Sequence, residues 1–244
     1  MKEAGLASWK AHRMIFAAGG RHTGREGEDP VTKEEERARN KEKVIAAALD
    51  CIQQMPVNEV TRVAIANRAG LTPRSLQRYF GTLDNLMQTV TQRYLEHFNQ
   101  CHREAFHAQN IAGKSGLEHL KFFLCSYEAL FDEGMPSAVV LTKIETYWRK
   151  RENPPFHVLF PPAAEKFYGT GEYKYDLFHT LLHAGRRDGS IRGDLDPDSV
   201  YLWLTASFAG LIRRVGTVPE MYGGKEKQII RSFAQAVADY LAAE

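Results

Sequence analysis

Apolar residues recur along most of this chain at intervals of three and four, which places them on one face of an α-helix. The spacing is clearest in the run Val44, Ile45, Ala48, Leu49, Ile52 and Met55. It predicts a helix that begins near Thr32 or Glu35 and ends before Pro56, because a residue that precedes proline disfavours the α conformation. The same spacing predicts later helices over residues 82–98, 117–130, 138–148, 173–187, 197–214 and 225–243. No segment alternates polar and apolar residues over the length of a strand, so the sequence predicts an all-α protein.

Two short helices joined by a sharp turn are predicted between Thr61 and Phe80. Thr61 and Thr72 can each cap a helix through the side-chain hydroxyl, and Pro73 suits the first helical position. Gly70 lies where the turn favours a positive φ, which costs glycine little. The second helix turns polar side chains away from its apolar face: Arg74, Ser75, Gln77 and Arg78. These features together are typical of a helix-turn-helix, and the alternative is a packed helical hairpin with solvated arginines.

Composition indicates where the protein functions and which kinds of partner it can have. The 244 residues are enough for one large domain or two small ones, and a net charge of +2 means that any basic surface is local. Cys51, Cys101 and Cys125 lie far apart and form no metal-binding pattern, so we expect buried thiols in a reducing cytoplasm. No apolar run approaches the roughly 20 residues that span a bilayer. We therefore expect a cytoplasmic protein with no membrane partner.

Three segments are expected along the chain. Residues 1–34 are predicted to be a mobile N-terminal extension, because the stretch GGRHTGREGEDP is rich in glycine and charge and has no sustained period. An alternative is that the natural chain begins nearer Val31. Residues 35–82 are predicted to hold the helix-turn-helix, and residues 83–244 are predicted to form a second, helical domain.

On these residues the chain resembles the TetR/AcrR family of transcriptional regulators. A helix over Ala38–Met55 directly precedes the motif, and IANRAGLTPRSLQRYFGTLDNLM parallels the family signature from Ile65 to Met87. The run GRRDGSIRGDLDPDSVYLWLTASFAGL is similar to the family's connection into its penultimate helix. The resemblance implies an N-terminal three-helix helix-turn-helix DNA-binding domain over residues 35–82 and a C-terminal helical ligand-binding and dimerisation domain over residues 83–244. It also implies a homodimer that binds double-stranded DNA.

The chain departs from the family pattern at Gln77 and Leu83, where members usually carry a tyrosine and a lysine that hold phosphate. The stretch LTPRSLQRYF also resembles half of an AraC-type DNA-binding domain, but no second motif follows Leu86. A helical interaction module without DNA binding is a further alternative. It would explain the amphipathic helices but not the outward Arg74, Gln77 and Arg78.

The resemblance implies that the Pro73–Tyr79 helix enters a major groove, with half-sites about one helical turn apart. Arg74 and Gln77 suit the edges of guanine and adenine, while Thr61, Thr72 and Tyr79 suit phosphate oxygens. Positive charge at the rim would come from Arg62, Lys41 and Lys43. The full set of predicted DNA-binding residues is Lys41, Lys43, Thr61, Arg62, Thr72, Pro73, Arg74, Ser75, Gln77, Arg78 and Tyr79.

The C-terminal part is expected to supply a dimer interface and a small-molecule pocket. The predicted interface residues lie on the last two helices: Val200, Leu204, Phe208, Leu211, Ile230, Phe233, Val237 and Tyr240. The predicted lining of the pocket is mainly aromatic: Phe123, Tyr127, Tyr147, Trp148, Phe178, Leu182 and Trp203. This lining favours an apolar or aromatic effector, although any single one of these residues could equally fill the core.

Neither an enzyme nor a cofactor is expected. The sequence carries no nucleophile elbow, phosphate loop or metal-ligand constellation. His179 and His183 have the i, i+4 spacing of metal ligands, but core or surface histidines are the preferred interpretation. The function predicted is a DNA-binding repressor that a small effector releases from a near-palindromic operator.

Overall fold

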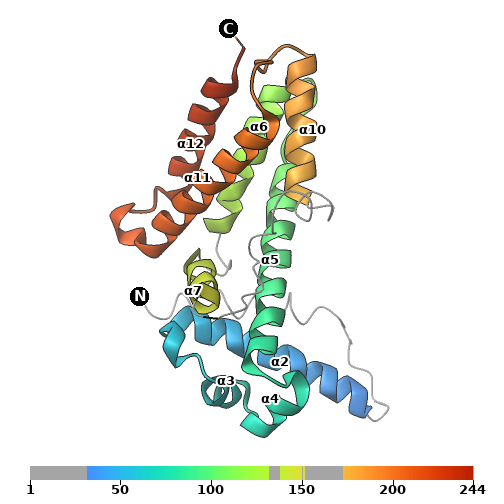
Figure 1. Cartoon of the computed structure of the whole chain (residues 1–244), viewed down its shortest axis with the longest axis vertical. Coiled ribbons are helices and arrows are strands. Elements are labelled where there is room, and N and C mark those ends of the chain that lie inside the picture. The colour runs from blue at the N-terminus through green and yellow to red at the C-terminus, as the bar shows by residue number, and fades with distance from the viewer. Residues whose placement is uncertain (1–31, 132–137, 150, 152–172, 244) are drawn as a thin grey trace. The chain divides into compact units, whose positions relative to one another are not determined.

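A computed structural model describes residues 32–131, 138–149, 151 and 173–243. Its α-helices are α2 (Lys33–Gln54), α3 (Arg62–Ala69), α4 (Pro73–Phe80), α5 (Leu83–His107), α6 (Gly116–Cys125), α7 (Ala138–Arg149), α10 (Tyr173–Arg187), α11 (Pro197–Thr217) and α12 (Glu226–Leu241) (Figure 1). Short 3-10 segments are η1 (Val57–Glu59), η2 (Ser126–Phe131) and η3 (Pro219–Met221). These residues contain no strand beyond an isolated bridge, so the all-α prediction is confirmed.

Two sequence predictions fall largely on residues that the structure leaves undescribed. Residues 150–172, which connect the predicted helices over residues 138–148 and 173–187, lie outside the described residues, except for Arg151. The N-terminal extension does too, except for Thr32–Glu34, which begin α2.

The chain divides into two compact units. The first comprises Met1–Arg93 with Lys143–Pro155, and the second comprises Tyr94–Thr142 with Phe156–Glu244. The division therefore falls within α5 and within α7. It differs from the division at residues 82 and 83 proposed from the sequence, because spatial contacts and not motif ends define these units.

Helix α2 is the base on which the first unit is built. Its start is fixed by a capping box: the Thr32 hydroxyl accepts from the Glu35 amide at 3.2 Å, and the Glu35 carboxylate accepts from the Thr32 amide at 2.8 Å. Acidic residues fill the first turn, where the helix dipole favours them. The helix ends at Gln54, just before Pro56 as predicted, and it buries Val44–Ile52 against the rest of the unit apart from Ala46.

The second half of α7 also belongs to the first unit. The Lys143 ammonium donates to the carbonyl oxygens of Gln53 and Met55, at 2.9 and 3.1 Å, where α2 ends. One turn further on, the Trp148 indole donates to the hydroxyl of Thr91 on α5 at 3.1 Å. Tyr147 and Arg151 both donate to the Asp84 carboxylate in the first turn of α5. These contacts join the beginning of α5 and the end of α2 through a segment remote from both in sequence.

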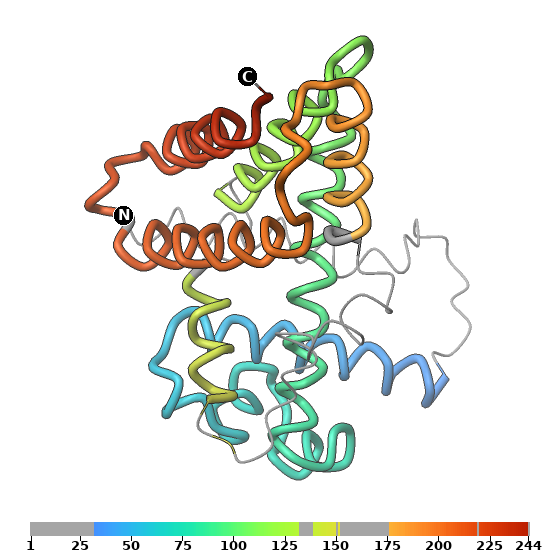
Figure 2. Tube along the Cα trace, turned by 45° about the horizontal axis from the view of Figure 1, so that its top comes forward, coloured from blue at the N-terminus to red at the C-terminus, as the bar shows by residue number. Residues whose placement is uncertain are grey.

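In the second unit, α6 lies between α10 and α12 (Figures 1 and 2). Its approach to α10 depends on Gly116, since a Cβ there would collide with the backbone of Gly185. Helix α5 extends to His107, two turns beyond the predicted end at residue 98. The predicted helix ends too early because it leaves out His102 and Phe106, which are buried and continue the apolar face.

Candidate nucleic-acid interface

The turn between α3 and α4 has the backbone of a helix-turn-helix. Gly70 is left-handed at φ 67° and ψ 33°, so the chain reverses where a side chain would be strained. The amide of Leu71 donates to the carbonyl of Ala66 at 3.0 Å, which closes the end of α3. Thr61 and Thr72 cap the two helices, accepting from the Ala64 and Ser75 amides at 3.2 and 3.1 Å. The predicted caps and turn are confirmed.

Helix α4 presents a polar face to solvent because one apolar residue anchors it. Leu76 is 2% exposed, whereas Arg74, Gln77 and Arg78 are exposed. Of the predicted DNA-binding residues on and before this helix, Thr72 and Pro73 are also exposed, and Ser75 and Tyr79 are partly buried. The helix therefore carries several hydrogen-bond donors and acceptors whose side chains are not needed for packing.

The Tyr79 hydroxyl is held from two sides. It accepts from Asn40 Nδ2 of α2 at 3.4 Å and from Arg78 Nη2 at 3.2 Å. The Arg78 guanidinium lies 5.1 Å from the centre of the Tyr79 ring. Sequence reasoning misses Asn40, because the local spacing of residues on α2 does not show that residue 40 contacts Tyr79 of α4.

A further ion pair fixes α3 on α2. Arg68 pairs with the carboxylate of Asp50, and Arg68 Nη2 also donates to Gln54 Oε1 at 2.7 Å. The hydrogen bond to Asp50 raises the pKa of Arg68 further above its usual range. Asp50 is largely buried, so this pair orients the first helix of the motif and is unlike the solvated arginines of α4.

The predicted cations at the rim lie on α2 and α3. Lys43 is exposed, and Lys41 and Arg62 are partly exposed. Thr61 is exposed beside Arg62, with its hydroxyl oxygen on the helix amide. The structure thus leaves all of these side chains accessible in the first unit.

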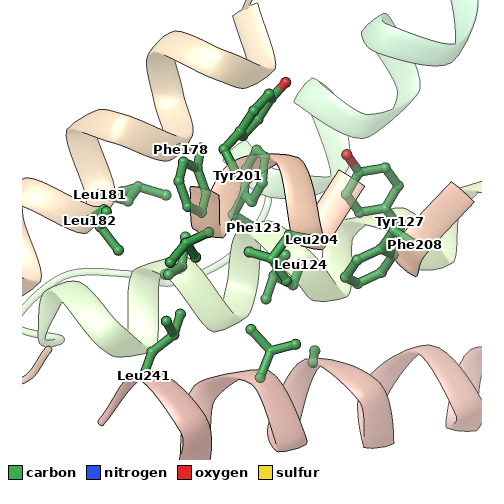
Figure 3. Close-up of a cluster of buried hydrophobic side chains, with 14 of the residues drawn as sticks. Phe123, Leu124, Tyr127, Phe178, Leu181, Leu182, Tyr201, Leu204, Phe208 and Leu241 are labelled. Carbon is green, nitrogen blue, oxygen red and sulfur yellow. The ribbon is translucent and has the colours of Figure 1, made fainter. Parts of the chain in front are cut away.

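The seven residues predicted to line a pocket do not form one cluster. Phe123, Tyr127, Phe178 and Leu182 lie in the buried core of the second unit (Figure 3). Tyr147 and Trp148 belong to the first unit and pack with Asp84 and Thr91 there. Trp203 is 45% exposed on α11. The aromatic character of these side chains predicts a shared pocket, but Tyr147 and Trp148 lie in the other unit and Trp203 lies at the surface.

The core around the first four of these residues is almost filled. A cavity of about 10 Å³ remains among aromatic and aliphatic side chains: Phe123, Leu124, Tyr127, Phe178, Tyr201, Leu204, Thr205 and Phe208. The rings of Tyr127 and Phe208 stack with centres 4.8 Å apart, and Figure 3 shows them adjacent, away from Leu181 and Leu182. A larger open groove of about 930 Å³ lies between α5, α6–η2 and α12, and none of the predicted pocket residues lines it.

The predicted dimer surface is mostly the chain's own core. Five of its eight residues are buried in the hydrophobic cluster of the second unit: Val200, Leu204, Phe208, Ile230 and Val237. Leu211 and Phe233 are partly buried against that cluster, and Tyr240 is 50% exposed. The sequence assigns the longest apolar stripe on each helix to the interface, whereas most of that stripe is already buried within the single chain.

A second apolar face on these helices points to solvent. Leu202 and Trp203 are 56% and 45% exposed on α11, and the Trp203 ring lies 5.6 Å from the ring of Tyr240 on α12. Small exposed residues, Ala206 and Gly210, continue the α11 face. The sequence signal for it was the presence of Leu202 and Trp203 off the main stripe.

The described residues form neither a cluster of metal ligands nor a helix that could span a membrane. They contain no group of three or more His, Cys, Asp and Glu side chains that could hold a metal ion. His179 and His183 have ring centres 6.3 Å apart, and His179 Nε2 lies 3.4 Å from an Asp198 carboxylate oxygen. None of the described helices is both long and apolar enough to cross a bilayer.

Comparison with solved structures finds many similar chains of low sequence identity. A TetR transcription regulator from Haloarcula marismortui matches with a TM-score of 0.59 at 18% identity, covering 84% of this chain and 99% of that one. A putative transcriptional regulator from Saccharomonospora viridis, in complex with choline, matches at 0.61 and 15%, covering 85% and 99%. The superantigen PfiT matches at 0.58 and 14%, covering 83% and 96%. No family model and no curated protein matches the sequence.

Proposed function

The chain has the fold of TetR-family transcriptional regulators, and we propose that it is a DNA-binding transcriptional regulator of that kind. The fold alone does not fix this function, since it is shared with a superantigen. The observation that carries the proposal is the solvent face of α4. Arg74, Gln77 and Arg78 are exposed on a short helix held by a cap, a left-handed glycine turn and buried Leu76.

The proposed contacts divide into base reading and backbone positioning. Arg74 would read a guanine edge bidentately, and Gln77 an adenine edge, from a helix seated in the major groove. The hydroxyls of Thr61, Thr72 and Tyr79 would donate to phosphate oxygens. The cations at the rim, Arg62, Lys41 and Lys43, would add sequence-independent attraction.

We place the homodimer contact on the exposed face of α11 and α12 that contains Leu202, Trp203 and Tyr240. Large apolar side chains gathered in solvent are typical of protein interfaces, and a second copy of this chain offers the matching face by two-fold symmetry. Such a dimer would present two α4 helices to half-sites about one helical turn apart on a near-palindrome.

The regulator would be a repressor released by a small apolar or aromatic effector. The core cavity of about 10 Å³ has room for at most about one water, so an effector must part the Tyr127–Phe208 stack to enter. The effector would bind the opened core and not the closed one. This difference in affinity between the two states is what a ligand needs in order to shift the protein from one to the other. Helices α5 and α7 each run from one unit into the other and would carry the change.

The function is tested by selecting genomic fragments with the full chain and measuring affinity for the recovered sequence. Tight, sequence-selective binding supports the proposal, and equal weak binding to all duplexes contradicts it. Screening small apolar and aromatic compounds against the complex then tests release. Thr205→Ile, which adds one carbon to the lining of the cavity, should bind DNA normally and resist the releasing compound.

A further prediction concerns Lys41 and Lys43, the two lysines of α2 proposed to attract the DNA backbone. Changing Lys41 and Lys43 to Ala should weaken binding to all sequences alike and flatten the salt dependence by up to about one unit per lost phosphate contact. Lys114 and Lys225 changed to Ala, both exposed in the second unit, are the matched control and should alter neither. A loss confined to the cognate sequence would contradict the role given to Lys41 and Lys43.

A further inference from the structure

We propose that Asn40 is a positioning residue that aims the hydroxyl proton of Tyr79 at a phosphate of the DNA backbone. The inference rests on the proposed function and deepens it. It assigns a role in DNA binding to the side of α2 that faces α4, which the motif itself does not include.

The proposal rests on the direction of the two hydrogen bonds at the Tyr79 hydroxyl. The Tyr79 oxygen receives N–H groups from Asn40 at 3.4 Å and from Arg78 at 3.2 Å. A phenol can both donate and accept, and here two donors already point at its oxygen. Its own proton must therefore point away from both, and the described part of the chain places no acceptor within hydrogen-bonding distance of it.

The missing acceptor is best supplied by an anion outside the protein. Tyr79 is partly exposed on α4, next to exposed Arg78. The guanidinium has five N–H donors, of which one is directed to Tyr79, so the others remain to meet the same anion. A phosphate oxygen accepts strongly from both groups, and hydroxyl and arginine donors of this kind fix a protein's register on a duplex.

Asn40 decides the direction because the group that it turns toward the Tyr79 oxygen is Nδ2, which donates and does not accept. If an acceptor stood in its place, the tyrosine proton would turn inward to it and leave only lone pairs facing the phosphate. Asp has nearly the same size as Asn, and its ionised carboxylate can only accept hydrogen bonds. The Asn40→Asp change therefore reverses the hydrogen bond while it keeps the packing of α2 on α4.

The experiment measures binding of the full chain to a fluorescent random-sequence duplex of about three helical turns at low salt. Asn40→Ala should weaken binding about fivefold, the value of one ordinary hydrogen bond. In a Tyr79→Phe background the same change should have no effect, because the proton it orients is absent. Asn58→Ala, an exposed asparagine in η1, is the matched control and should leave binding unchanged.

Asn40→Asp provides the second test and should weaken binding more than Asn40→Ala does. Part of that loss comes from the added negative charge, and it alone should persist in the Tyr79→Phe background. Thermal melting of each variant is recorded beside binding. A merely structural role for Asn40 would lower the melting temperature and weaken binding equally in both backgrounds, and that result would overturn the inference.

The outcomes separate this inference from the function on which it rests. If the wild-type chain binds no duplex, the proposed DNA-binding function fails. If the wild-type chain binds and Asn40 variants match it, or weaken Tyr79→Phe to the same extent, only the positioning role is refuted.

Discussion

At the scale of single residues, Arg74 combines exposure with a defined position. It follows Pro73 at the second position of α4, a helix whose packing depends on Leu76. Arg74→Ala should therefore leave the circular dichroism unchanged while it costs about 1–3 kcal/mol on the cognate duplex. Preference should relax at one symmetric pair of base positions. Arg187→Ala, an exposed arginine of the second unit, is the control.

Binding of Arg74→Ala to random duplex distinguishes the two roles open to this arginine. An equal loss on cognate and random DNA would make Arg74 a phosphate contact. No loss on either would mean that α4 does not read the bases.

The burial of His179 predicts that the stability of the protein depends on pH. Burial lowers its pKa, against the opposing pull of the Asp198 carboxylate 3.4 Å away. A folded-state pKa below the unfolded value of about 6.5 favours the neutral ring, so its contribution is complete above that pH and is lost as the pH falls. The melting temperature of the wild type should thus decline below about pH 6.5 more steeply than that of His179→Gln.

The matched control for this experiment is His107→Gln, because His107 is exposed at the end of α5 in the same unit. Its melting profile should follow that of the wild type. Parallel profiles for wild type and His179→Gln would show that the His179 ring does not become protonated at the expense of stability.

At the scale of elements, the most unexpected partner of the first unit is α7. Lys143 places its ammonium on two carbonyl oxygens at the end of α2, where the helix dipole favours a cation. Burial lowers the pKa of Lys143, and its two acceptors compensate for that burial with hydrogen bonds. Lys143→Met keeps the apolar stem and removes the charge, so it should reduce the free energy of unfolding by about 1 kcal/mol.

The control for Lys143 is Lys33→Met, on the exposed first turn of α2. Chemical denaturation should show no change there. If both variants unfold alike, the cap at the end of α2 contributes nothing, and α7 is held to this unit by Tyr147, Trp148 and Arg151 instead.

At the scale of the whole molecule, the solvent-facing apolar residues of α11 and α12 predict a dimer. Trp203→Glu places a charge on that face without disturbing the core, since Trp203 is 45% exposed in the single chain and is no part of its core cluster. Sedimentation should show monomers, and DNA affinity should fall about 100-fold or more because two linked half-sites no longer bind together.

Met221→Glu is the control, since Met221 is 66% exposed in η3, outside the face formed by Leu202, Trp203 and Tyr240. It should remain dimeric. A wild-type chain that sediments as a monomer at micromolar concentration would refute the dimer, and a dimeric Trp203→Glu would refute this choice of face.

The sequence by itself determined the helical class and the helix-turn-helix. Residues 61–80 specify that motif through local interactions: a hydroxyl caps the helix that follows it, and Gly70 adopts a positive φ without strain. Such interactions span three or four residues, so the order of residue types is enough to predict them. The same is true of the end of α2 before Pro56.

Only the tertiary structure decided which apolar faces are core and which are free. Val200, Leu204 and Phe208 form a continuous stripe, but the stripe gives no sign of whether the chain's own α6 or a second copy covers it. Likewise Tyr147 and Trp148 share their aromatic character with Phe123 yet pack in another unit, since the chain returns to α5 there. Asn40 meets Tyr79 across 39 residues for the same reason. Burial and partnership between distant segments follow from the path of the chain in space, which local periodicity does not encode.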